Sequence, residues 1–379
     1  MHYYLISGER SGDLHASNLI KQLKRFDEHA TFRGFGGEHM MEAGATVVVH
    51  YSKMAVMGFL EVLLNIRKIS HYISLCKADI SASKPDVVIL VDYGGFNTKI
   101  AQYCKKQNIK VFYYIPPKVW AWYQRRAIGL KENTDRIFVI LPFEKAFFKK
   151  FGCEVDYVGN PVLDAVKAHV SDSQFRHRHN FAELEPLVAL LPGSRRQELQ
   201  RIVPLLAAIA RSHPQQQFAV AAVNNLDQSL YSDLRALPNV KFVFEDTYNL
   251  LQHATAAIVT SGTATLETAL FRVPQIVVYK ANRLSYLLAA KVIKVDFISL
   301  VNLIAGKEVV KELLQQEATV ENVSIELNRI INEQAYRATM LGGYDQVIKL
   351  LDTGSASENA ASLMTKYLHD GVPQANYFG

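Results

Sequence analysis

The sequence predicts an α/β protein built from two doubly wound, Rossmann-like domains, and three observations support this prediction. Short β-rich apolar runs alternate with longer helical patterns along the chain, which is typical of parallel strands joined by crossover helices. The length of 379 residues exceeds that of one ordinary domain. Apolar residues make up 49% and charged residues 21%, which is the composition of a folded chain.

Ten apolar runs predict the strands, with helices between them. The first half contributes Tyr3–Ser7, Thr31–Phe35, Val87–Val91, Lys110–Ile115 and Arg136–Ile140. The pattern restarts in the second half with Leu187–Leu191, Gln217–Ala222, Val240–Phe244, Ala256–Thr260 and Gln275–Val278. After about Glu308 the strand signal disappears, so we expect only helices there: four helical stretches, the last from Glu358 to about His369.

These runs predict an N-terminal α/β domain over residues 1–165 and a C-terminal one over 186–349, with a helical C-terminus at 350–379 that joins the first domain. A polar, His/Arg-rich stretch suggests a linker over 166–185. Open α/β sheets bind ligands beyond the carboxyl ends of their strands. We therefore expect both sheets to face a central cleft, and function to lie on the loops after strands.

Composition and termini narrow the class of protein. The N-terminal residues lack the basic start and long apolar run of a secretory signal, and no run approaches the roughly 18 apolar residues of a spanning helix, which predicts a cytoplasmic protein. The isolated Cys76, Cys104 and Cys153 lack the spacing of a metal or redox site. Neither a P-loop nor a dinucleotide fingerprint occurs, which argues against nucleoside-triphosphate hydrolysis and nicotinamide redox chemistry. We expect no cofactor.

Four loops of the first half are candidate sugar-binding or catalytic segments. The loop after the first strand offers backbone N–H groups through Gly8, Glu9, Ser11, Gly12 and Asp13, although a plain strand-to-helix turn fits equally well. The loop Gly34–Gly37 has the same two interpretations.

Asp92 follows the strand Val87–Val91 and precedes a helix that contains Asn97. A carboxylate there can act as a general base for an attacking hydroxyl, or it can simply cap the helix. Trp120, after Pro116 and Pro117, can stack on a sugar or an acyl group, or it can pack in the core.

Two loops of the second half predict a nucleotide-diphosphate pocket, because each joins a strand to a helix N-terminus. One loop supplies Gly193, Ser194 and the guanidinium of Arg195. The other supplies N–H groups, hydroxyls and an acid that can accept ribose hydroxyls: Ser261, Gly262, Thr263 and Glu267. No Asp-x-Asp triplet is present, so we expect the leaving diphosphate to be neutralised without a metal ion.

An amphipathic segment, Met54–Ile73, is apolar on nearly all sides at its start. Burial against the sheet would explain it, and so would contact with acyl chains or a bilayer through Met54, Val56, Met57, Phe59, Leu60 and Leu63. Residues 1–160 carry 22 Lys and Arg against 15 Asp and Glu, and this excess favours an anionic membrane surface.

Taken in order, these loops resemble the lipid-A-disaccharide synthase family across nearly the whole chain. The motifs are Gly8–Asp13, Gly34–Gly37, Met57–Val62, Asp92–Asn97, Val119–Trp122, Leu191–Arg195, Ser261–Glu267 and Ser299–Asn302. The chain departs from the usual pattern at Arg10, Gly94, Lys118 and Val301, where Ala, Pro, Ser and Pro are more common. These departures affect local loop shape.

The resemblance implies a GT-B fold and an inverting transfer from UDP-2,3-diacylglucosamine to 2,3-diacylglucosamine 1-phosphate. The products would be the β-1,6-linked lipid A disaccharide 1-phosphate and UDP. The resemblance also implies that Asp92 is the base for the acceptor 6-hydroxyl. The donor nucleotide would contact Arg195, Gly262, Thr263, Glu267 and Asn302. We further expect a peripheral protein of the inner membrane that binds no nucleic acid, with a homodimer left open.

Two other functions fit the fold. One is a different GT-B enzyme, either a UDP-N-acetylglucosamine transferase for another lipid-linked acceptor or a UDP-sugar 2-epimerase. An epimerase would not need the apolar segment. The other is a two-domain small-molecule-binding protein, against which the retained Asp92 argues.

Overall fold

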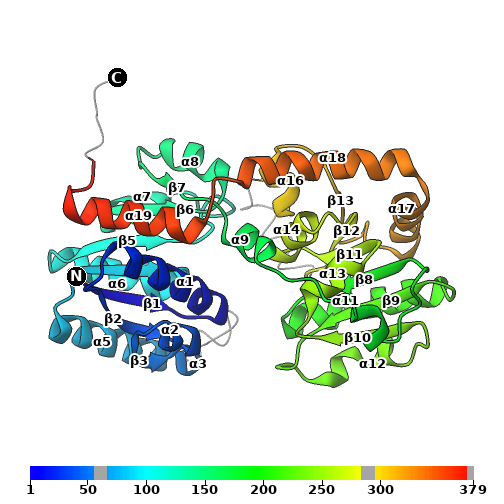
Figure 1. Ribbon diagram of the computed structural model, residues 1–379, viewed down its shortest axis with the longest axis horizontal. Coiled ribbons are helices and arrows are strands. Elements are labelled where there is room, and N and C mark those ends of the chain that lie inside the picture. Colours follow the sequence, from blue (N-terminus) through cyan, green and yellow to red (C-terminus); the bar gives the residue numbers. More distant parts are fainter. Residues whose placement is uncertain (55–65, 283–294, 374–379) are drawn as a thin grey trace. The chain divides into compact units, whose positions relative to one another are not determined.

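The computed structural model describes residues 1–54, 66–282 and 295–373, and the chain forms two compact units (Figure 1). The first unit contains Met1–Pro161 and the chain from Thr353 onward, and the second contains Val162–Asp352. Each unit is an α/β structure around its own parallel sheet.

The sheet of the first unit has seven parallel strands in the order β3-β2-β1-β4-β5-β6-β7. The strands are β1 (His2–Ser7), β2 (Thr31–Gly36), β3 (Thr46–His50), β4 (Val87–Val91), β5 (Lys110–Tyr114), β6 (Arg136–Val139) and β7 (Asp156–Tyr157). Strand β1 pairs with both β2 and β4, so the strand order reverses beside it. Such a switch point is where open α/β sheets bind ligands. The loops that follow β1 and β4 therefore meet at the expected binding position.

The sheet of the second unit has six parallel strands in the order β10-β9-β8-β11-β12-β13. The strands are β8 (Leu187–Leu191), β9 (Gln217–Ala222), β10 (Val240–Phe244), β11 (Ala256–Thr260), β12 (Gln275–Tyr279) and β13 (Lys311–Leu314). Strand β8 pairs with β9 and β11, which puts the switch point between β8 and β11. The two predicted phosphate-binding loops follow these two strands.

All ten predicted strands are present, and the structure adds β3, β7 and β13. The expectation that no strand follows Glu308 is wrong, because β13 pairs with β12 at the edge of the second sheet. The sequence gives little sign of this strand, since Leu313 is the one buried residue of its four. Among the described residues three helices follow β13, not four: α17 (Val320–Asn332), α18 (Gln334–Leu351) and α19 (Ala356–His369).

Helices cover both sheets. Those of the first unit are α1 (Arg10–Phe26), α2 (Glu38–Glu42), α3 (Tyr51–Met54), α5 (Ile66–Ser83), α6 (Gly94–Lys106), α7 (Arg126–Asn133) and α8 (Pro142–Lys149). The chain then passes through α9 (Pro161–Lys167) to the second unit. That unit has α10 (Phe175–Arg178), α11 (Arg196–Ser212), η1 (Gln228–Tyr231), α12 (Ser232–Arg235), α13 (Thr247–His253), α14 (Thr263–Leu270) and α16 (Leu300–Ala305).

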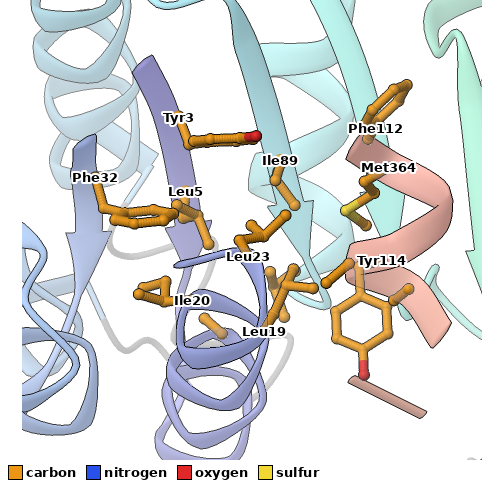
Figure 2. Packing of buried hydrophobic residues seen from close by; sticks show 14 of the residues in the cluster. Tyr3, Leu5, Leu19, Ile20, Leu23, Phe32, Ile89, Phe112, Tyr114 and Met364 are labelled. Carbon is orange, nitrogen blue, oxygen red and sulfur yellow. The ribbon is translucent and has the colours of Figure 1, made fainter. Parts of the chain in front are cut away.

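The terminal helix α19 is part of the first unit. It packs on α1, and Met364 lies in the same buried cluster as Leu19 and Leu23 of α1 and Ile89 of β4 (Figure 2). Full burial of one such side chain contributes roughly 1.5–3 kcal/mol. This helix therefore supports the sheet from which the loops of the first unit project.

The stretch 166–185, expected to be a linker, packs as part of the second unit. Phe175 and Phe181 are buried in the core of that unit, and Arg176 donates hydrogen bonds to the carbonyls of Ala182 and His253. The polar composition of this stretch concealed these two apolar anchors.

The apolar segment predicted to meet lipid lies mostly outside the described residues, which applies to Val56, Met57, Phe59, Leu60 and Leu63. Met54 is described, and its side chain is buried at the end of α3. Among the described residues, the structure contains no helix with the length and apolar character needed to cross a bilayer.

Candidate active site

The loop after β1 uses its acid for structure. The buried carboxylate of Asp13 accepts hydrogen bonds from the backbone N–H groups of Gly37, His39 and Met40 at 2.6, 3.0 and 3.3 Å. These groups belong to the N-terminal turn of α2, where a negative charge is stabilising. Asp13 thus ties the first loop to the loop Gly34–Gly37 and has little capacity left for a sugar.

The other predicted residues of this loop surround the start of α1. Glu9 is the N-cap residue and Ser11 lies in the first turn, and both side chains are exposed. Gly12 is buried, and a Cβ there would lie 3.3 Å from Cβ of Ser7. Gly8 allows a closer approach, because a Cβ there would lie 2.2 Å from the ring of Tyr93. The loop after β1 and the Asp92 turn are thus in direct contact.

The Asp92 turn has an unusual backbone. Asp92 and Tyr93 both have positive φ, 50° and 51°, before α6 begins at Gly94. Left-handed conformations cost non-glycine residues roughly 1–2 kcal/mol each. Such strain is retained where the surrounding structure enforces it, and it occurs often at functional sites. The conformation places Asp92 directly past the carboxyl end of β4, beside the switch point.

Two side chains hold this turn from behind. The buried Asn97 donates through Nδ2 to the carbonyl oxygen of Asp92 at 2.8 Å, and the hydroxyl of Tyr113 donates to the same oxygen at 2.9 Å. Asn97 was predicted as a sugar-binding residue, and the structure instead places it under the turn as a positioning residue. Tyr113, on β5, was not found from the sequence because it reads as an ordinary buried strand residue.

The surroundings of the Asp92 carboxyl group change its pKa. Burial raises its pKa above the usual value, while the backbone N–H of Tyr93 and the ammonium group of Lys118 lower it in part. A base gains proton affinity from such a rise and remains ionised as long as its pKa stays below the working pH. The site therefore suits Asp92 to general-base chemistry.

The two tryptophans of the loop after β5 differ in exposure. Trp120 is 6% exposed, donates through Nε1 to Glu144 Oε1 at 3.1 Å and stacks edge-on against Phe143. It packs in the core, so the alternative interpretation of Trp120 applies. Trp122 is 53% exposed and Tyr123 is 64% exposed, so these two rings are the ones available for ligand contact.

Glu144 is a second buried carboxyl group below this loop. Its Oε2 accepts from the backbone N–H groups of Leu141 and Ile140 at 2.9 and 3.2 Å, and burial raises its pKa to about 7. Sequence analysis missed it, although a Glu three residues after the N-cap is a recognisable capping signal. Glu144 positions the Trp120 loop and reaches no open surface.

In the second unit, the first predicted phosphate loop is occupied by the protein itself. Gly193 has φ of +101°, and Glu198 Oε2 accepts from the backbone N–H groups of Ser194 and Arg195 at 3.1 and 3.2 Å. The guanidinium of Arg195 lies 3.2 Å from Glu198 Oε1 and is 67% exposed. The loop thus already binds a carboxylate with the groups predicted to bind a diphosphate.

The second phosphate loop is braced to its neighbour. Ser261 donates through Oγ to the carbonyl of Ile298 at 3.0 Å, and Thr265 Oγ1 accepts from the N–H of Leu300 at 3.2 Å. Gly262 has φ of +155° and is the N-cap of α14, so the loop exposes Thr263 at the helix start.

Glu267 lies one turn into α14. Tyr248 donates its hydroxyl to Glu267 Oε1 at 3.2 Å, and burial raises the pKa of this carboxyl group. Among the described residues this bond engages Oε1 alone, so Glu267 combines a fixed orientation with remaining capacity to accept a hydroxyl hydrogen bond at Oε2.

The side chain of Asn302 is buried and forms hydrogen bonds within the protein. Its Oδ1 accepts from the N–H groups of Val309 and Val310, and its Nδ2 donates to Glu312 Oε1 at 2.9 Å and to the carbonyl of Val310. Glu312 in turn accepts from the backbone N–H and hydroxyl of Ser299. Together they fix the start of α16. Glu312 was missed because its strand was missed.

Comparison with known proteins decides the family. A sequence model of the family described as Lipid-A-disaccharide synthetase matches residues 3–365. The chain is 35% identical over 370 residues to the lipid-A-disaccharide synthase of Geobacter metallireducens, covering 96% of each chain. It is 38% identical to the Syntrophus aciditrophicus enzyme, covering 94% of this chain and 95% of that one. The chain belongs to the lipid-A-disaccharide synthase family. It is a glycosyltransferase of lipid A biosynthesis.

Solved structures agree on the fold. A UDP-GlcNAc 2-epimerase from Neisseria meningitidis, bound to UDP-GlcNAc, superposes with a TM-score of 0.66 at 14% identity, covering 98% of this chain and 100% of that one. The calicheamicin glycosyltransferase gives 0.65 at 14% identity, covering 98% and 99%. This member of the family therefore has the GT-B-type fold, with two Rossmann-like domains and a helical C-terminus.

Proposed function

We propose that the chain transfers 2,3-diacylglucosamine from its UDP derivative to the 6-hydroxyl of 2,3-diacylglucosamine 1-phosphate, with inversion and without a metal ion. The observation that supports this most strongly is the Asp92 turn. It presents a carboxyl group of raised pKa past the end of β4, on a strained backbone that Asn97 and Tyr113 hold.

The reaction moves one proton and exchanges one bond. Asp92 accepts the proton of the acceptor hydroxyl as its oxygen forms a bond to the anomeric carbon of the donor sugar. The bond between that carbon and the β-phosphate oxygen breaks, and UDP leaves with the electron pair. Attack opposite the leaving group turns an α-linked donor into a β-linked disaccharide. General-base assistance of this kind is worth roughly 10² to 10⁴ in rate.

The second unit would bind UDP. The diphosphate replaces the carboxylate of Glu198 at the N–H groups of Ser194 and Arg195, and the guanidinium of Arg195 neutralises the charge that builds on the leaving group. Thr263 and the start of α14 add donors, and Glu267 accepts a ribose hydroxyl. Asn302 supports these loops from behind through Glu312 and Ser299.

Both substrates carry acyl chains, which favours work at a membrane surface. The basic excess of residues 1–160 suits an anionic leaflet, and the apolar segment that follows Met54 would contact lipid. We therefore also propose that the enzyme is peripheral on the inner membrane.

The test is purified protein with UDP-2,3-diacylglucosamine and the lipid 1-phosphate acceptor in detergent with chelator, following both UDP and disaccharide. We expect equal amounts of the two products. Absence of disaccharide, or a need for added divalent metal, would contradict the corresponding part of the proposal.

The Asp92→Asn variant isolates the base. We expect kcat to fall roughly 10² to 10⁴-fold while the fold is kept. Burial raises the pKa of Asp92 in the folded state, so ionising it at pH 7 disfavours folding, and the variant should unfold at the same or a higher denaturant concentration than wild type. Asp86→Asn, at an acid near the opposite end of β1, is the matched control and should keep full activity.

A further inference from the structure

Two cations near the Asp92 turn form no ion pair with any carboxylate among the described residues. Lys118 is exposed in the turn after β5, and Arg126 is exposed at the first residue of α7. Within the described part of the first unit, ion pairs are made by the N-terminal ammonium group and by the side chains of Arg25, Arg33, His39, His50, Lys105 and Arg136. Lys118 and Arg126 therefore keep their charge free for a ligand.

Packing brings both cations to the Asp92 turn. Pro117 lies so close to Gly94 that an added Cβ on Gly94 would be 2.9 Å from the proline ring, which fixes the Lys118 turn against the start of α6. Arg126 and Pro117 line the same cavity of about 120 Å³ together with Thr98 of α6. Lys118 is near enough to lower the pKa of Asp92, and Arg126 acts likewise on Tyr113, whose hydroxyl holds the Asp92 carbonyl.

The chemistry of the acceptor demands a cation at this place, given the function proposed above. A base must lie within hydrogen-bond reach of the hydroxyl that it deprotonates. In a sugar 1-phosphate, C1 carries the phosphate and C5 carries the arm with the 6-hydroxyl. These two carbons lie on either side of the ring oxygen. The phosphate therefore comes within one sugar ring of Asp92. Without compensation, the phosphate would repel the carboxylate and raise its pKa further.

We propose that Lys118 and Arg126 bind the phosphate of the acceptor sugar and so orient its hydroxyl toward Asp92. The planar guanidinium of Arg126 suits two parallel bonds to phosphate oxygens, and the ammonium of Lys118 acts as a compact charge. Acceptor selectivity for a phosphorylated sugar would then arise in the first unit, separately from donor binding.

The experiment compares two acceptors that differ only in the phosphate: 2,3-diacylglucosamine 1-phosphate and 2,3-diacylglucosamine, in the same micelles at saturating donor. The ratio of their kcat/KM values is the phosphate preference. We expect Lys118→Gln and Arg126→Gln each to reduce this preference about tenfold, because each variant replaces a charged hydrogen bond to the phosphate with a neutral one. Changes at Asp92 or in micelle binding affect both acceptors and cancel in the ratio.

Arg125→Gln is the matched control, because this exposed cation neighbours Arg126 in the chain, and it should keep the preference of the wild type. Equal losses with both acceptors in the two test variants would overturn the proposal, and so would an equal loss of preference in Arg125→Gln. Failure of the proposed function would look different, since wild type would then form disaccharide from neither acceptor. All three side chains are exposed, so unchanged melting curves should accompany these results.

Discussion

The two buried asparagines of the predicted site, Asn97 and Asn302, show how differently the two units are built. Both are fully buried. Asn302 uses its oxygen and its nitrogen in four hydrogen bonds to β13 and the turn before it. Asn97 uses its Nδ2 under the Asp92 turn, but among the described residues its Oδ1 has no donor.

The surroundings of Asn302 are therefore fully hydrogen-bonded, whereas those of Asn97 are strained. A buried polar atom without a partner costs roughly 1–3 kcal/mol, and the two left-handed residues beside Asn97 add to that cost. The Asp92 turn of the first unit is thus locally unfavourable in energy. In the second unit the buried amide of Asn302 is fully hydrogen-bonded and stabilises the segment around it.

The largest effect is expected on stability, from a substitution at Asn302. Asn302→Ala leaves the buried N–H groups of Val309 and Val310 without an acceptor, so the free energy of unfolding should fall by about 3 kcal/mol. Urea denaturation measures this. Asn322→Ala, at an exposed amide of α17, should cost less than about 1 kcal/mol. Similar costs for the two variants would refute the described role of Asn302.

A substitution at Asn97, under the strained Asp92 turn, should lower the catalytic rate. Asn97→Ala removes one of the two donors to the Asp92 carbonyl, and we expect kcat to fall about tenfold, or about 1.4 kcal/mol, because Asp92 is less well positioned. UDP affinity should not change. Asn133→Ala also removes one amide-to-carbonyl bond in the first unit and should leave kcat intact. A loss of UDP affinity in Asn97→Ala would break the proposed separation of roles.

A smaller effect is expected where Glu198 occupies the phosphate loop. Glu198→Gln removes the negative charge that competes with a diphosphate for the N–H groups of Ser194 and Arg195. UDP should bind about threefold tighter, since charges at helix N-termini are worth typically 0.3–1 kcal/mol. Calorimetric titration measures the change. Glu183→Gln, at a distant exposed acid, should leave the affinity unchanged. Weaker UDP binding in Glu198→Gln would show that Glu198 supports the site and does not compete.

The smallest effect is a shift in pH dependence. Asp92 must be ionised to act, so kcat/KM should fall as the pH drops through its pKa, which burial places above the usual value. Lys118 lowers that pKa, so Lys118→Gln should move the acid limb to higher pH. A limb that moves to lower pH would contradict the assignment of Asp92 as the titrating base.

Much of this organisation could be predicted from the sequence. The apolar runs located ten of the strands, and the sequence placed Asp92 and Arg195 in the loops that follow β4 and β8, because both signals are local. What could not be predicted depends on tertiary contacts. Glu312 lies on a short edge strand with one buried residue, and Trp120 reads as a ligand platform until its indole is seen bonded to Glu144, 24 positions along the chain.

The central claim is that the first unit supplies the base and the second unit binds UDP. Titration of UDP into Asp92→Asn and Arg195→Gln, with turnover measured on the same samples, tests it most directly. The account predicts that Asp92→Asn binds UDP as wild type does yet forms almost no disaccharide. It predicts that Arg195→Gln binds UDP about tenfold more weakly, because a charged hydrogen bond to phosphate is lost. Equal weakening of UDP binding in the two variants would contradict it.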